Sequence, residues 1–144
     1  MIISTKGRYA LRVMVDLAQH QNGKYIPLKE IAERQEISEK YLESVLKVLV
    51  KEKFLLGLRG KGGGYMLNRP ASQITAWDVI SLTENNGLAA VSCLGPDAVS
   101  CPRELSCSTL PMWQEFEQVV REFFSKYTIE DLAANGRETY DYVI

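Results

Sequence analysis

Residues 38–51 read SEKYLESVLKVLVK, and residues 54–67 read FLLGLRGKGGGYML. Ser38 can cap a helix over the first stretch, because its side chain can accept a hydrogen bond from the first turn. One face of that helix is apolar at α-helical spacing: Leu42, Val45, Leu46 and Leu49. The opposite face is polar: Lys40, Glu43, Ser44 and Lys47. Pro27 can open a shorter helix before it, and two such helices joined by a tight turn are typical of a helix-turn-helix unit.

The second stretch predicts a β-hairpin wing. Residues 54–59 read as a strand, residues 60–64 as a glycine-rich turn and residues 65–67 as the returning strand. Arg59 and Lys61 stand at the turn on a backbone nearly free of side chains, which suits contact with a minor groove or with phosphate. These glycines do not spell a dinucleotide fingerprint or a P-loop.

Capping signals predict two further helices in the N-terminal half. Ser4 can cap a first helix that ends near Asn22. Thr75 and Asp78 form a capping box for a helix that we expect to pack under the wing.

A long amphipathic helix is predicted over residues 111–127. Its large side chains recur every three or four residues, with Val119 and Phe124 broadening the stripe: Trp113, Phe116, Val120, Phe123 and Tyr127. A small domain rarely needs so much aromatic surface on a terminal helix, so the stripe predicts the seam of a homodimer. Thr128 and Asp131 can cap a last short helix, and residues 136–144 are expected to follow it as a tail outside the helix.

The charge of the chain is divided unevenly. The net charge is −1, yet residues 1–70 hold 13 Lys or Arg against 7 Asp or Glu, and residues 71–144 hold 4 against 11. A basic N-terminal half favours a polyanionic partner, because each neutralised phosphate releases condensed counterions. Charges interrupt any signal peptide in the first twenty residues, so we expect a cytoplasmic protein with no membrane partner.

All three cysteines, Cys93, Cys101 and Cys107, fall between Ser92 and Pro111, in a segment that reads as a long loop without secondary structure. The seven and five intervening residues contain no Cys-x-x-Cys pair, which counts against a structural zinc site. Thiolates are soft ligands, and three of them leave one position of an iron-sulfur cluster for another ligand. The residues alone leave open a cluster, a thiol redox switch, zinc binding and plain reduced thiols.

Four stretches carry a family resemblance: STKGRYA at residues 4–10, IAERQ at 31–35, YLE at 41–43 and RGKGGGY at 59–65. With the three spaced cysteines they resemble bacterial winged-helix regulators of the IscR, NsrR and CymR type, the IscR-like members most closely. The resemblance implies a homodimeric transcription repressor that binds pseudo-palindromic promoter DNA. It also implies an iron-sulfur cluster on Cys93, Cys101 and Cys107 that senses iron-sulfur, redox or nitric oxide status, with 2Fe-2S favoured and 4Fe-4S possible.

The expected DNA contacts lie on the recognition helix, on the wing and at the start of the first helix: Lys6, Arg8, Ser38, Lys40, Tyr41, Glu43, Ser44, Lys47, Arg59, Gly60 and Lys61. A carboxylate such as that of Glu43 can accept from cytosine N4 but repels phosphate, so it selects sequence more than it adds affinity. The alternative is a surface pair between Glu43 and Lys47.

Two ligands of such relatives are missing from this chain. IscR-like members carry a histidine where this chain has Leu110, and NsrR-like members carry an aspartate where it has Arg8. The candidates for a fourth ligand, besides an exogenous thiol or water, are Asp97, Glu104, Ser108 and Glu115. The single histidine, His20, is expected at a helix end rather than at the metal.

We therefore expect a mainly α protein with a small β-hairpin: a winged helix-turn-helix domain plus a long C-terminal dimerisation helix. The expected division is a DNA-binding domain over residues 1–84, a cysteine-bearing cluster loop over 85–111, and the dimerisation helix and tail over 112–144. No enzymatic activity is expected. The alternatives are a cluster-free regulator that uses thiol oxidation or a protein co-regulator and, less favoured, an iron-sulfur electron carrier.

Overall fold

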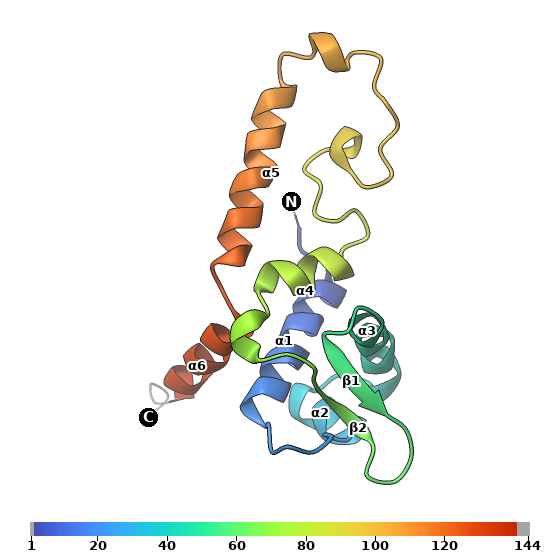
Figure 1. The fold of residues 1–144 in the computed structure, drawn as a ribbon, viewed down its shortest axis with the longest axis vertical. Helices are drawn as coiled ribbons and strands as arrows, with labels where there is room; N and C mark the ends of the chain where they lie inside the picture. Colours follow the sequence, from blue (N-terminus) through green and yellow to red (C-terminus); the bar gives the residue numbers. More distant parts are fainter. Residues whose placement is uncertain (1, 141–144) are drawn as a thin grey trace.

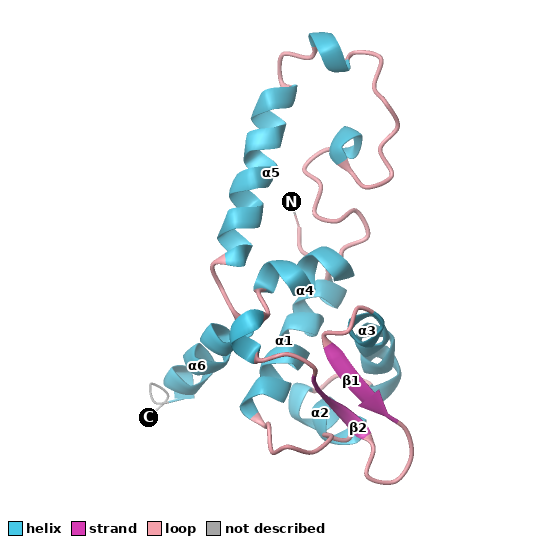
Figure 2. Cartoon of the chain, viewed as in Figure 1, coloured by secondary structure: helices cyan, strands magenta, loops and turns pink. Residues whose placement is uncertain are grey.

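The computed structural model describes residues 2–140, and of residues 136–140 the backbone alone. Its described part is mainly helical, with a two-stranded antiparallel sheet, as the sequence predicted (Figure 2). The elements are α1 (Thr5–Gln19), α2 (Leu28–Gln35), α3 (Glu39–Lys51), β1 (Leu55–Leu58), β2 (Gly64–Leu67), η1 (Ala71–Gln73), α4 (Ala76–Thr83), η2 (Ser92–Leu94), η3 (Glu104–Ser106), α5 (Leu110–Ser125) and α6 (Ile129–Tyr140), where η marks a 3-10 helix.

Helices α1 to α4, α6 and the hairpin form a base, from which α5 projects as a long arm (Figure 1). The core of this base comes from the apolar stripes that the sequence predicted in α1, α2, α3 and α4. Four side chains of α3 are fully buried in it: Leu42, Val45, Leu46 and Leu49. The side-chain oxygens of Ser4, Ser38 and Thr75 accept hydrogen bonds from the first turns of α1, α3 and α4, so these predicted caps are confirmed.

A buried carboxylate joins α1 to α2. Asp16 is 1% exposed and accepts hydrogen bonds from Arg34 Nε at 3.0 Å, from Arg34 Nη2 at 2.8 Å and from Gln35 Nε2 at 2.8 Å. A buried charge is tolerated when it is paired and fully hydrogen-bonded, so this contact holds α2, and with it the start of α3, against α1.

The hairpin is tied to the base by a bridge between Ile26 and Tyr65. Each of these residues donates its backbone N–H to the carbonyl of the other, at 2.8 and 2.9 Å. Gly64 lies beside this bridge with φ of +145°, and a Cβ atom there would lie 2.1 Å from the carbonyl oxygen of Ile26. The hairpin can therefore dock only because residue 64 has no side chain.

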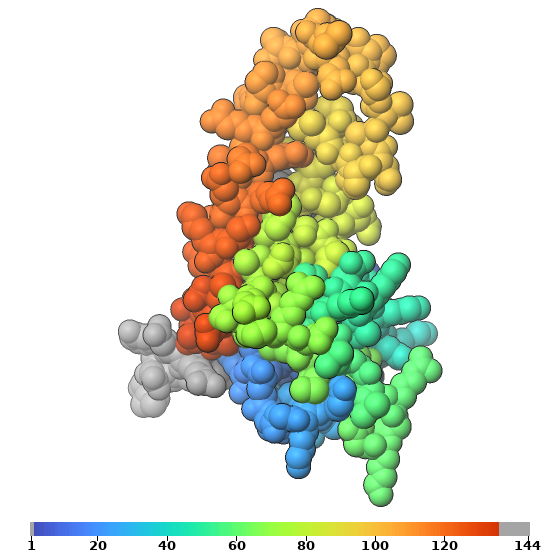
Figure 3. Space-filling view, in the orientation of Figure 1, coloured from blue at the N-terminus to red at the C-terminus, as the bar shows by residue number. Residues whose placement is uncertain are grey.

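The lower end of α5 is fastened to the base. A bridge joins Thr75 to Thr128, and Ile129 is fully buried in the core. The predicted cap of α6 is present, because Thr128 and Asp131 each accept a hydrogen bond from the backbone N–H of the other. The upper end of α5 continues into the cysteine segment, residues 85–109, at the far end of the molecule (Figure 3).

Three expectations need correction. Helix α6 continues through Tyr140, whereas residues 136–144 were expected to run out; residues 141–144 lie outside the described part. The cysteine segment is not free of secondary structure, since it contains η2 and η3. Helix α4 packs against α1, α3 and α5 rather than under the wing, because its apolar side turns toward the helical core.

Candidate nucleic-acid interface and cysteine cavity

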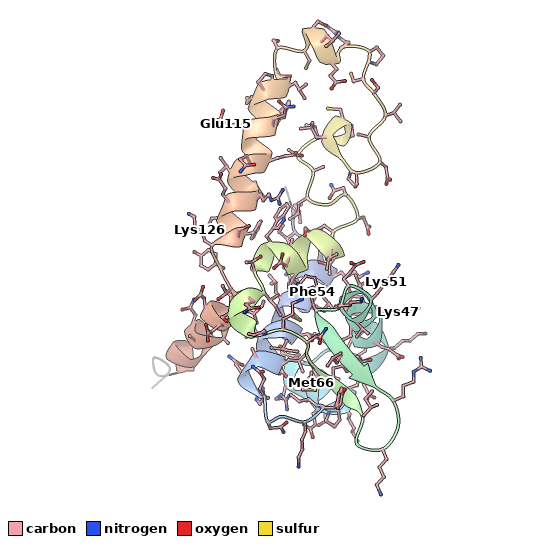
Figure 4. The ribbon with its side chains drawn as sticks, viewed as in Figure 1. Lys47, Lys51, Phe54, Met66, Glu115 and Lys126 are labelled. Atoms are coloured by element: carbon pink, nitrogen blue, oxygen red, sulfur yellow. The ribbon has the colours of Figure 1, made fainter. Side chains whose placement is uncertain are left out.

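The outward face of α3 carries the polar side chains that the sequence analysis placed there. Lys40, Glu43, Ser44 and Lys47 are all exposed, because the opposite face of the helix is buried in the core. Figure 4 shows Lys47 and Lys51 pointing away from the base. Lys51 follows Lys47 by four residues and was not among the expected contacts, although that spacing places both on one helix face.

Two predicted contact residues, Ser38 at the N-cap of α3 and Ser44 within it, also have structural roles. Ser38 Oγ accepts a hydrogen bond from the N–H of Tyr41 at 3.2 Å, and the hydroxyl of Ser44 donates to the carbonyl of Tyr41 at 2.6 Å. The ring of Tyr41 meets that of Tyr9 edge to face, 5.7 Å between centroids. These contacts orient the start of α3 relative to α1.

The wing stands beside α3. Arg59, Gly60 and Lys61 are exposed at its tip, where Gly60 and Gly62 have positive φ of 90° and 75°. A hollow of about 340 Å³ separates the wing from α3 and is lined by side chains of both, including Glu43, Lys47, Arg59 and Tyr65. Burial, followed by the nearby Glu43 carboxylate, raises the pKa of Tyr65, so this hydroxyl stays a hydrogen-bond donor.

The structure does not bring Lys6 and Arg8 to the wing. They lie in the first turn of α1, at the end of the base from which the arm projects, whereas the wing tip is at the opposite end (Figure 1). Arg8 is exposed, and its Nη2 donates to Thr5 Oγ1 at 3.1 Å. Their predicted role in DNA contact therefore needs DNA that also reaches the start of α1.

All three cysteines line one cavity of about 210 Å³ at the far end of the molecule, together with Glu104 and Leu110. Cys93 and Cys101 are exposed and Cys107 is half-buried. Hydrogen bonding from the Thr109 side chain, aided by backbone N–H groups, lowers the pKa of Cys107, which favours the thiolate. Among the side chains that the structure describes, those of residues 2–135, however, no three His, Cys, Asp or Glu groups converge closely enough to hold a metal ion.

The donor set fits an iron-sulfur cluster even though the sulfur atoms are not drawn together. Three thiols on one cavity are soft ligands of the required kind, and little holds the segment in its present conformation. Its described backbone hydrogen bonds between residues 91 and 106 all join residues three apart. The segment can close around a ligand without breaking long-range hydrogen bonds of that stretch.

His20 lies where the sequence analysis expected it. It ends α1, its side chain is 43% exposed, and its Nδ1 is 2.8 Å from the carbonyl oxygen of Asp16. It does not line the cysteine cavity.

Helix α5 has two apolar sides. Trp113, Val120 and Phe124 are half-buried. The other side is between 39% and 56% exposed and follows a spacing of three or four residues: Met112, Phe116, Val119, Phe123 and Tyr127. The residues predicted to form the dimer seam therefore lie on two different sides of α5. Met112 belongs to the exposed side, although the sequence analysis did not include it.

Within the described residues, no helix is both long and apolar enough to cross a membrane. Residues 3–135 match the Rrf2 family, described as iron-dependent transcriptional regulators. The HTH-type transcriptional regulator IscR of Sodalis glossinidius is 36% identical over 135 residues, which cover 94% of this chain and 80% of that protein.

Two solved structures are similar throughout. T. potens IscR matches with a TM-score of 0.74 and 32% identity, over 96% of this chain and 90% of that one. CymR, the global cysteine regulator of B. subtilis, matches with a TM-score of 0.72 and 34% identity, over 94% of this chain and 98% of that one.

Proposed function

This chain belongs to the Rrf2 family of transcriptional regulators, and we propose that it is a cytoplasmic repressor whose promoter binding responds to an iron-sulfur cluster. Regulation of transcription through DNA binding follows from the family. The cluster, the repressing direction and the residue roles are the proposal. The observation that carries it is the single cavity lined by Cys93, Cys101 and Cys107 at one end of a winged-helix protein.

The outward face of α3 is the proposed reader of the major groove. Lys40 and Lys47 would contact phosphate or guanine, Ser38, Tyr41 and Ser44 would complete this surface, and Glu43 would select among sequences. Arg59, Gly60 and Lys61 of the wing would follow the neighbouring minor groove or backbone, and Lys6 and Arg8 would add phosphate contacts. These proposed contacts are supported by solvent exposure, because all of the residues are exposed or half-buried.

Cys93, Cys101 and Cys107 are the proposed cluster ligands, with 2Fe-2S favoured over 4Fe-4S. When bound, the cluster supplies a redox-active and chemically labile centre. The protein's own part is to close the segment around it. This closure has a direct route to α5, because Cys107 lies three residues before Leu110, where that helix begins.

Hydrogen bonds at and near the start of the cysteine segment connect it to α1 and to α5. Glu84, where the segment leaves α4, accepts two hydrogen bonds from Ser4 at the start of α1. The N–H of Ala90 donates to Glu117 of α5 at 2.9 Å. Ordering of the segment would therefore act on α1 of the base and on the arm at once, which is how occupancy would reach the DNA-binding surface.

A homodimer through the exposed apolar side of α5 completes the proposal. Five large apolar side chains along one exposed helix face suit burial against a second copy. A two-fold dimer presents two copies of α3 to half-sites about 34 Å apart, so a small rotation about the seam changes the fit to DNA.

The test compares cluster-loaded protein, purified without oxygen, with apo protein on DNA from its own promoter at fixed salt. The proposal expects different affinities or sequence preferences, and a reporter gene that is derepressed when the three cysteines are replaced by serine. Equal binding and an unchanged reporter would exclude cluster sensing.

A cluster-free regulator is the second candidate. It is favoured by the lack of a converged metal site among the side chains of residues 2–135. Such a protein would purify without colour under anaerobic conditions, and its DNA binding would not change when iron is chelated.

A further inference from the structure

The proposed cluster needs one more ligand than the three cysteines provide, because cluster irons are held by four terminal ligands in all. The inference that follows rests on that proposed function. Neither Leu110, whose side chain is hydrocarbon, nor the exposed hydrophobic Val99 can supply a donor, although both line the cavity.

The acidic side chains near the cavity differ in where they lie. Glu104 lines the cavity with all three cysteines. Asp97 lines a separate hollow formed with Asn85, Ser92 and other residues. Glu117 is already bonded to the N–H of Ala90. Figure 4 shows Glu115 pointing away from the cysteine segment.

The backbone places Glu104 between two of the cysteines at a regular interval. The N–H of Glu104 donates to the carbonyl of Cys101 at 3.1 Å, and η3 then runs from Glu104 to Ser106 and is capped at its end by Cys107. Glu104 therefore begins η3 with Cys101 three residues before it and Cys107 three residues after it, and all three line the same cavity.

The Glu104 carboxylate is exposed, and among the described residues it forms no side-chain hydrogen bond or ion pair. It can turn toward a metal without giving up another partner. Its negative charge and two oxygen atoms make it a competent ligand for iron, though a harder one than sulfur.

We propose that Glu104 is the fourth ligand of the cluster, so that three thiolate sulfurs and one carboxylate oxygen hold it within a single protomer. Ser108 is excluded from this role because it does not line the cavity, and a neutral hydroxyl is a poorer ligand than a carboxylate. A carboxylate oxygen would exchange more readily than the three thiolates, which suits a sensor.

The test uses the full chain, reconstituted without oxygen with ferric iron and sulfide. Glu104→Gln keeps the shape of the side chain and removes its charge, Glu104→Cys offers a fourth thiolate, and Asp97→Asn removes an acid of the same segment as a matched control. The readouts are iron and sulfide per protomer, the Mössbauer spectrum of the cluster, and the rate of iron loss to a chelator.

The expected result is that Glu104→Gln loses iron at least about tenfold faster than the unaltered chain, by analogy with other losses at metal sites. It should also change the spectrum of one iron site. Glu104→Cys should retain iron with a spectrum typical of thiolate ligands alone, and Asp97→Asn should behave like the unaltered chain.

Two results would overturn the assignment. One is an unchanged spectrum and loss rate in Glu104→Gln, and the other is equal damage in Asp97→Asn, which would mean that any change in the segment disturbs the site. An unaltered chain that takes up neither iron nor sulfide would instead overturn the proposed cluster itself, so the two failures are distinguishable.

Discussion

The carboxylate of Glu84 accepts two hydrogen bonds from Ser4, from its backbone N–H at 2.9 Å and from its hydroxyl at 2.8 Å. Ser4 Oγ in turn accepts from the N–H of Gly7 at 3.0 Å, as the N-cap of α1. Glu84 directly follows α4, where the cysteine segment begins. The root of that segment is therefore fastened to the first turn of α1, although the two are 80 residues apart in sequence.

Glu84→Ala should lower the free energy of unfolding by about 1–3 kcal/mol, because it leaves two half-buried donors of Ser4 without their acceptor. Urea denaturation of the apo protein measures this loss. Glu52→Ala is the control, because the side chain of Glu52 is exposed and forms no described hydrogen bond. Equal effects of the two substitutions would show that the Ser4 contact does not stabilise the fold.

The effect of Gly7→Ala on the free energy of unfolding should have opposite signs depending on the residue at position 84. A Cβ atom at Gly7 would lie 2.5 Å from Glu84 Oε1, so the substitution displaces that carboxylate and should destabilise the unaltered chain. In the Glu84→Ala background this obstacle is gone, and alanine should stabilise the helix by about 0.5 kcal/mol. A double-mutant cycle measures the coupling, and additive effects would contradict the prediction.

Capping shows what could be predicted from sequence. Ser38, Thr75 with Asp78, and Thr128 with Asp131 act within three residues, so local sequence is sufficient to identify them. The tie between Ser4 and Glu84 and the buried ion pair of Asp16 with Arg34 depend on how distant elements pack, and no local pattern in one sequence indicates such partners.

The apolar stripe of α5 and the cysteine segment could be predicted from the sequence only in part. Helical spacing identified the apolar residues of α5, but which of them are exposed depends on what packs against the helix, namely α4 and, beside Trp113, residues 88–90. Hence Trp113 is half-buried while Met112 is exposed. The interval from Cys101 through Glu104 to Cys107 is visible in the sequence, yet only the fold of the segment shows that all three line one cavity.

Gly64→Ala should lower the free energy of unfolding by about 3 kcal/mol or more, because the new Cβ atom would collide with the backbone of Ile26 and Pro27. Gly62→Ala is the matched control. The φ of Gly62 is also positive, at +75°, but nothing lies within 4 Å of a Cβ atom built there, so this substitution should cost only about 1 kcal/mol. Denaturant titration distinguishes the two, and similar losses would mean that the wing is not docked on Ile26.

Val119→Glu should convert the proposed dimer to a monomer, because Val119 is 56% exposed in one chain and would be buried in the seam. Burying an unpaired carboxylate costs several kcal/mol, so the dissociation constant should rise at least about a hundredfold. Sedimentation analysis measures it. Gln114→Glu adds the same charge where α5 lines the hollow beside α4, and should leave the dimer intact. A dimer that tolerates Val119→Glu would exclude this seam.

Lys47→Ala should weaken binding to every duplex by a similar factor, because a lysine that contacts phosphate adds affinity without reading sequence. The slope of the logarithm of the binding constant against that of the salt concentration should fall by about 1. Fluorescence anisotropy over a salt series measures this with the protein's own promoter and a scrambled duplex. Lys126→Ala is the control, since Lys126 directly follows α5 and lies at the opposite side of the molecule (Figure 4). If Lys47→Ala weakened binding to the promoter alone, Lys47 would contact a base instead. Unchanged affinity for both duplexes would show that Lys47 does not contact DNA.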